Sequence, residues 1–196
     1  MKTASRVKIA TLAVAASLVL GCIPSLHPFY RDEDVVFDAS LVGRWVDESG
    51  ETWEFRDTGD RAYELLYTDE DGKTGKFSIH MFKIGEATFL DLYPAEPEPE
   101  APWNDLYRLH LMPVHTLLHV RQVRPSLQMA FPEPKWLEDR IAEDPATIRH
   151  EIIDDDLVVL TASTDELREF WSRHVRTDGA FGDYSDLKPA TPGPAD

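Results

Sequence analysis

Residues 52–56 of the chain, TWEFR, show the pattern from which the fold class can be predicted, because two large aromatic residues alternate with polar ones. The same alternation returns at 63–68 (YELLYT) and at 77–81 (FSIHM). Successive side chains of a β-strand point to opposite faces of the sheet, so a period of two is typical of strands that bury one face only. Half-buried strands of this kind belong to antiparallel sheets.

Short turn sequences connect these strands, and most of them contain glycine beside an acidic residue. They are residues 48–50 (ESG), 58–60 (TGD), 69–72 (DEDG) and 85–86 (GE). Turns this short make consecutive strands neighbours in the sheet, so the pattern predicts a meander. Further strands are predicted at 87–93, 106–112, 117–124, 127–131, 148–153 and 157–162.

Two helices are predicted among and after the later strands. Pro134 is followed by KWLEDRI, which fits a short helix near 134–144 with the proline in its first turn. Residues 163–166, STDE, match the capping box, with a serine at the N-cap and a glutamate three residues later. Hydrophobic residues then recur at helical spacing, which predicts an amphipathic C-terminal helix near 164–176 that docks on the sheet.

The fold class that follows is mainly β. We expect an antiparallel up-and-down barrel or a strongly curved sheet of about eight or nine strands, because closure removes exposed sheet edges. The domain is predicted to span residues 41–176. Residues 177–196 lose their periodicity and are predicted to form an irregular, largely disordered tail.

The first 21 residues have the composition of an export signal. Three basic residues and no acidic one precede a hydrophobic run at 9–20. A charged start and a run of this length are typical of a secretory signal peptide. A membrane-spanning helix needs about 20 apolar residues, which makes a retained anchor the weaker alternative.

The hydrophobic run ends at Val19-Leu20-Gly21-Cys22, which contains the only cysteine of the chain. A small residue before a cysteine at this position resembles the lipobox of bacterial lipoproteins, where the cysteine is acylated and becomes the mature N-terminus. The resemblance implies diacylglycerol and palmitoyl groups on Cys22 and attachment to the cell envelope. Ile23 replaces the aspartate of an inner-membrane retention signal, which favours the periplasmic face of the outer membrane. The alternative is an ordinary signal peptide and a buried Cys22 thiol.

Residues 22–40 are predicted to join the anchor to the barrel. Pro24, Pro28 and the acidic residues 32–34 (DED) indicate a tether. Residues 35–37 (VVF) are too hydrophobic for solvent and are predicted to plug one end of the fold.

The mature chain is strongly acidic. Without residues 1–21 it has 175 residues, a length typical of one domain with its own core. It keeps 17 basic against 36 acidic residues, a net charge of −19, which excludes nucleic acid as a partner. The charge serves solubility or, in a second interpretation, attracts a cation or a basic envelope protein.

Gly43-Arg44-Trp45, on the first strand after the plug, is similar to the G-x-W motif of lipocalins, where the tryptophan packs across the closed end of the barrel. The up-and-down strands and the late helix also resemble that family. Residues 41–45 (LVGRW) and 89–93 (FLDLY) resemble small lipocalin-like, calycin-like lipoproteins of bacterial envelopes. The resemblance implies structural roles for Gly43 and Trp45 and a barrel that binds a small hydrophobic or amphipathic ligand.

The motifs of common enzymes, such as the nucleophile elbow, the phosphate loop and the zinc-binding HExxH, do not occur, so a catalytic function is not favoured. Histidines remain as candidates. His80, His110 and His119 lie on predicted strands, which could bring two or three imidazoles to one zinc, copper or haem iron. Scattered histidines without a shared ligand are the alternative, because a register shift of one residue reverses the face.

Asp91 stands among hydrophobic residues and is predicted to be a buried carboxylate. Its structural interpretation is a hydrogen bond or an ion pair with an arginine such as Arg108 or Arg121, and its functional interpretation is acid–base chemistry. Three functions therefore compete: a non-catalytic ligand-binding module, an assembly lipoprotein with a solid barrel that binds a basic envelope protein, and a metal or haem site. No cofactor beyond the lipid on Cys22 is predicted.

Overall fold

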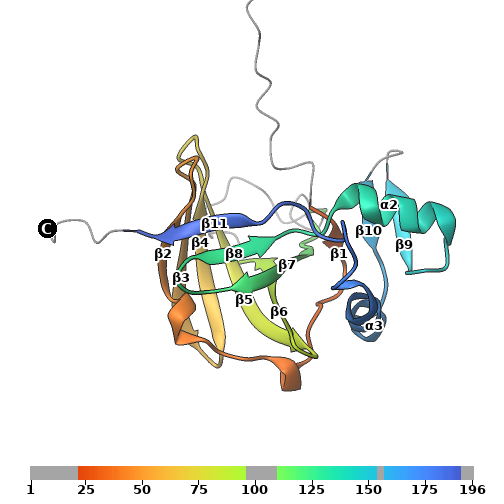
Figure 1. Cartoon of the computed structure of the whole chain (residues 1–196), viewed down its shortest axis with the longest axis horizontal. Coiled ribbons are helices and arrows are strands. Elements are labelled where there is room, and N and C mark those ends of the chain that lie inside the picture. Colours follow the sequence, from red (N-terminus) through yellow and green to blue (C-terminus); the bar gives the residue numbers. More distant parts are fainter. Residues whose placement is uncertain (1–21, 96–109, 154–156, 191–196) are drawn as a thin grey trace, which may run out of the picture.

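The computed structural model describes residues 22–95, 110–153 and 157–190. Eight antiparallel strands form a closed barrel (Figure 1). They are β2 (Gly43–Val46), β3 (Thr52–Gly59), β4 (Ala62–Thr68), β5 (Thr74–Ile84), β6 (Ala87–Pro94), β7 (His115–Gln122), β8 (Leu127–Ala130) and β11 (Ser185–Pro189). Strands β2 to β8 pair in chain order, and β11 closes the ring between β8 and β2. The predicted up-and-down barrel is confirmed.

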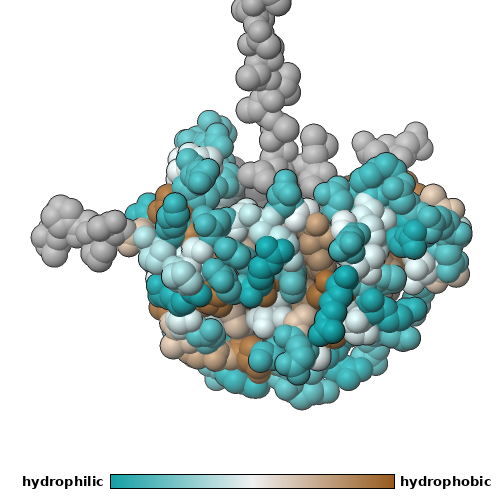
Figure 2. All heavy atoms as spheres, viewed as in Figure 1, coloured by the Kyte–Doolittle hydropathy of each residue, from teal (hydrophilic) through white to brown (hydrophobic). Residues whose placement is uncertain are grey.

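The alternation at 52–56 has the predicted consequence. Trp53 and Phe55 of β3 lie opposite Tyr67 and Leu65 of β4, and all four belong to or pack against one hydrophobic cluster inside the barrel. On the other face of β3, Arg56 forms exposed ion pairs with neighbouring glutamates. Hydrophilic side chains prevail on the molecular face shown in Figure 2, where hydrophobic ones are scattered.

The prediction of an irregular tail from residue 177 was wrong for β11. This strand has a single buried residue, Leu187, in the pattern SDLKP, which gives no clear period. Its strand conformation comes from its neighbours, because Ser185 to Leu187 pair with β8 and Lys188 pairs with Val46 of β2. The barrel needs this strand to close.

The predicted strand at 106–112 is not part of the described barrel. Residues 106–109 lie outside the described residues, and residues 110–112 are not in a strand. The predicted hairpin is present as β9 (His150–Ile153) and β10 (Leu157–Leu160), but it lies outside the barrel. There β10 pairs in parallel with the short β1 (Pro24–Ser25), which in turn pairs with β7.

Both helices form where the sequence predicted them, as α2 (Pro134–Glu143) and α3 (Thr164–His174). The capping box is present, and the backbone N–H of Ser163 donates to the Glu166 carboxylate at 2.8 Å. Together with the β9–β10 hairpin the helices cover one side of the barrel and enclose a second hydrophobic core (Figure 1). This core contains Phe82 and Phe89 from the outer barrel wall and Phe170 and Trp171 from α3.

The N-terminal segment is packed along its length. Ile23 and Phe29 are buried in the second core, so the part that was predicted to be a tether is instead held against the barrel wall. The segment then passes beneath the barrel through two short 3-10 helices, η2 (Asp32–Asp34) and η3 (Ala39–Leu41) (Figure 1). Val36 packs against the interior cluster there, as expected of a plug.

Trp45 completes this closed end. It is 1% exposed, and its indole N–H donates to the Leu41 carbonyl oxygen at 2.8 Å. The guanidinium of Arg124, from the turn between β7 and β8, lies 4.6 Å from the centre of a Trp45 ring, a distance at which a cation is attracted by the aromatic face. Gly43 on the same strand has a φ of +131°, a conformation that favours glycine.

Candidate ligand-binding cavity

A cavity of about 490 Å³ lies at the end of the barrel opposite Trp45. Its wall comes from the first residues of β3, β5, β7 and β11 and from the last residues of β4, β6 and β8. Most of the wall is hydrophobic, with Trp53, Leu65, Phe77, Leu92, Leu118 and Met129 among its residues. The volume falls within the range of pockets that hold one small molecule.

The interior is thus filled at one end and open at the other. An eight-stranded barrel is just wide enough to be filled by side chains or to hold one small ligand. Trp45, Phe55 and Tyr63 are nearly inaccessible and fill the closed half. Sequence alternation indicated that Phe55 and Tyr63 point inward, and the G-x-W resemblance placed Trp45 at the closed end. Neither indicated how far along the barrel axis the large side chains extend.

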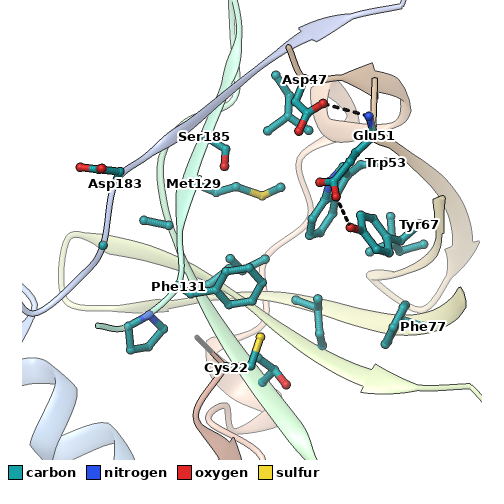
Figure 3. Close-up of a pocket in the computed structure, with 18 of the residues that line it drawn as sticks. Cys22, Asp47, Glu51, Trp53, Tyr67, Phe77, Met129, Phe131, Asp183 and Ser185 are labelled. Atoms are coloured by element: carbon teal, nitrogen blue, oxygen red, sulfur yellow. Dashed lines mark hydrogen bonds between the residues drawn. The ribbon is translucent and has the colours of Figure 1, made fainter. Parts of the chain in front are cut away.

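Glu51 is the buried carboxylate of this cavity. Glu51 is 6% exposed, and its Oε1 accepts a hydrogen bond from the Tyr67 hydroxyl at 2.7 Å. In Figure 3 the carboxylate reaches inward from the β2–β3 turn, between Trp53 and Tyr67. Burial raises the pKa of Glu51 above its ordinary value, the hydrogen bond from Tyr67 opposes the rise, and the charges of Asp47 and Glu70 add to it. Burial and the nearby Glu51 raise the pKa of Tyr67, which keeps its proton.

A tight turn holds Glu51 in place. Asp47 Oδ1 accepts hydrogen bonds from the backbone N–H groups of Ser49, Gly50 and Glu51 at 3.0, 2.9 and 2.9 Å. Gly50 has a φ of +95°, which is unfavourable for residues with a Cβ. The Asp47 carboxylate therefore stabilises the turn, and the turn directs Glu51 into the barrel. The sequence predicted a turn at 48–50 but not this role.

The wall residues that carry a charge at neutral pH are all acidic, and these four are Asp47, Glu51, Glu133 and Asp183. Within the described part of the chain, no lysine or arginine lines the cavity. The Asp183 carboxylate points away from it in Figure 3, and Glu133 Oε1 accepts a bond from the backbone N–H of Lys135 at the start of α2. Glu51 is consequently the carboxylate best placed to meet a ligand.

Cys22 also lines the cavity. Its half-buried side chain lies across the cavity from Glu51, with the sulfur directed inward (Figure 3). Burial raises the pKa of the Cys22 thiol. Nothing in the sequence connected the predicted acylation site with the interior of the barrel.

The candidate metal ligands do not meet. His80 stacks on Tyr30 with ring centres 4.4 Å apart, His119 is hydrogen-bonded to the Tyr184 hydroxyl, and His110 is exposed before β7. Among the described residues, no group of three histidine, cysteine or acidic side chains is arranged to hold a metal ion. Burial lowers the pKa of His119 to about 4, and the charge of Arg121 adds to this effect.

Asp91 is buried, as predicted, but its partners are not arginines. It is 1% exposed; Oδ2 accepts from the backbone N–H of Phe29 at 2.8 Å, and Oδ1 is hydrogen-bonded to His115 Nδ1 at 2.7 Å. Arg121 instead lies 3.5 Å from the centre of the Tyr184 ring, and Arg108 is outside the described residues. The Asp91 carboxylate thereby secures the N-terminal segment to the barrel, at the residue Phe29 that is buried in the second core.

No protein-family model, curated protein or solved structure matches the chain. The class is therefore defined by architecture: a closed antiparallel barrel of eight strands, consistent with a calycin-like barrel, with an internal cavity at one end. Of the helices in the described ranges, none has the length and apolar character needed to cross a membrane.

Proposed function

We propose that this protein is an envelope lipoprotein whose barrel binds one small hydrophobic or amphipathic ligand without transforming it. The observation that carries the proposal is the cavity of about 490 Å³, enclosed by hydrophobic side chains from seven of the barrel strands. Transfer of a nonpolar ligand from water into such a wall is favourable in proportion to the area buried. The volume suits a single ligand.

The position of Cys22 supports a ligand that comes from a membrane. An acylated Cys22 would hold the protein on the periplasmic face of the outer membrane, and this residue is part of the cavity wall. Two or more acyl chains attach a protein stably to a bilayer. With the acylated sulfur turned out of the cavity toward the bilayer, the cavity would lie next to the lipid surface, so a poorly soluble ligand would not have to cross water to enter it.

The cavity speaks against the interpretation of the protein as a purely structural module, which assumed a solid barrel. A scaffold gains stability from a filled interior, because empty space forfeits packing contacts. The closed half of this barrel is filled in that way, and the other half is not. A basic envelope protein remains a proposed additional partner for the acidic surface.

The test is to fill the cavity and measure binding. In a Cys22→Ser background, which avoids detergent, Met129→Trp adds an indole to the cavity wall, and Lys76→Trp adds the same ring to the exposed outer face of β5. A fluorescent hydrophobic dye should bind the parent and the Lys76→Trp variant with one-to-one stoichiometry, and Met129→Trp should weaken binding about 10-fold or more. The proposal fails if no dye binds the parent, or if both variants bind it alike.

A further inference from the structure

We propose that the ligand is an amphiphile with a cationic head group, and that the Glu51 carboxylate binds this head while the hydrophobic wall holds the tail. The inference rests on the proposed ligand-binding function and adds the chemical class of the ligand. Three features of the cavity support it: the burial of Glu51, the charge of the wall, and the aromatic rings beside the carboxylate.

The first feature is a buried carboxylate without a cationic partner. Glu51 is 6% exposed, and none of the ion pairs among the described residues includes Glu51 or Asp47. A buried carboxylate is costly unless it is paired. Its one side-chain hydrogen bond comes from the neutral Tyr67 hydroxyl to Oε1, so Oε2 has no side-chain donor among the described residues. A cation inside the cavity would supply the missing partner.

The second feature is the sign of the charge along the wall. Asp47 and Glu51 lie at one side of the cavity and Glu133 at another, and no described wall residue is basic. An anionic head group would meet like charge with no counter-ion, whereas an ammonium group would be attracted. The wall therefore disfavours ligands with an anionic head, such as fatty acids, and favours ligands with a cationic head. Specific sites commonly reject close analogues by such unfavourable contacts.

The third feature is the pair of aromatic rings next to the carboxylate. The rings of Trp53 and Tyr67 have centres 5.0 Å apart, and both residues line the cavity on the two sides of Glu51. Aromatic faces attract cations electrostatically, and tryptophan does so most strongly. A head group bound to Glu51 would contact both rings, so the aromatic residues and the carboxylate favour the same charge.

The experiment compares three probes that share one tail: dodecylammonium, dodecanol and dodecanoate, each below its aggregation limit at neutral pH. They compete with the hydrophobic dye for the Cys22→Ser protein. We expect dodecylammonium to bind about 10-fold or more tightly than dodecanol, since a hydrogen bond to a charged group contributes more than a neutral one. Dodecanoate should bind most weakly.

Two variants locate the preference. Glu51→Gln keeps the shape of the side chain and removes its charge, so it should bring the ammonium and alcohol affinities to within about 3-fold of each other. Glu48→Gln makes the same charge change in the same turn, but Glu48 is exposed and does not line the cavity, so the preference should persist.

The outcomes separate this inference from the function on which it rests. If none of the three probes displaces the dye and no dye binds, ligand binding itself is wrong. If all three bind with equal affinity, or if the ammonium preference survives Glu51→Gln, the barrel binds hydrophobic tails and the proposed role of Glu51 is overturned.

Discussion

The two ends of the barrel are built from the same strands and differ in how their buried groups are satisfied. At the closed end, the Trp45 indole donates to a backbone oxygen and Arg124 covers its ring. At the open end, Glu51 is buried beside an empty volume of about 490 Å³ and has one neutral hydrogen-bond donor. The closed end is thus packed for stability, and the open end is the half in which we propose that a ligand binds.

The open end also holds the predicted anchor. If Cys22 is acylated, all membrane attachment should depend on it, so Cys22→Ser should move essentially all of the protein from the membrane pellet to the soluble fraction or leave it with its signal uncut. Folding should be retained, because the thiol has no bonded partner among the described residues. Fractionation after a high-salt wash measures the distribution. A variant that is processed normally and still sediments with membranes would contradict the lipoprotein prediction.

Trp45→Ala and Trp53→Ala compare the two ends directly. Removing a fully packed tryptophan leaves a cavity, and Trp45→Ala should lower the free energy of unfolding by about 3–5 kcal/mol. Trp53 already borders the cavity, so the decrease in the free energy of unfolding should be about 1–3 kcal/mol smaller for Trp53→Ala than for Trp45→Ala. Urea denaturation followed by circular dichroism gives both values.

Ligand affinity should show the reverse order for these two variants. Trp53 lines the cavity and Trp45 does not, so Trp53→Ala should weaken dye binding and Trp45→Ala should leave it nearly unchanged under conditions where both are folded. Equal losses of stability together with equal losses of binding would remove the proposed division between the ends.

Glu51→Gln should change the free energy of unfolding least, and the size of this change should depend on pH. The pKa of Glu51 in the folded protein is raised from 4.5, so the folded state holds the proton more tightly than the unfolded state does. The stability contributed by this group is therefore greatest at low pH and is lost as the pH rises through the raised pKa. Glu51→Gln, which has no charge to bury, should match the parent at low pH and exceed its stability at neutral pH.

Urea denaturation of the parent and of Glu51→Gln at several pH values measures this difference, with Glu48→Gln as the exposed control. The preference for dodecylammonium should weaken as the pH falls through the same window, because Glu51 becomes protonated and loses its charge. The nearby groups are Asp47 and Glu70, whose charges raise the pKa of Glu51, and Tyr67, which stays protonated. A pH-independent gap between parent and Glu51→Gln would show that the Glu51 side chain is not buried in its charged form.

Much of the fold follows from local pattern. The alternation at 52–56 determines which residues of β3 face inward, and the capping box with its hydrophobic face determines α3. These features are encoded within a few residues, because the periods of strands and helices are fixed by backbone geometry. The G-x-W similarity likewise placed Trp45 at the closed end, where the structure has it.

The site was less accessible to sequence analysis, since it depends on residues that only the closed barrel brings together. Phe29 and Asp91 are 62 positions apart, and His115, at the start of β7, is the other partner of Asp91. His80 and His119 contact separate tyrosines, Tyr30 and Tyr184, and do not contact each other. Alternation fixes the face of a side chain but not its level along the barrel or its neighbours on other strands.

Local spacing and composition were therefore enough to predict most of the strands, the two helices, the antiparallel meander and the acidic character of the protein. Three features become apparent in the folded barrel alone: residues 185–189 complete it, its interior is open at one end, and Cys22 and Glu51 line the same cavity. Strand closure sets these relations, since it joins segments far apart in the chain whose local patterns carry no information about one another.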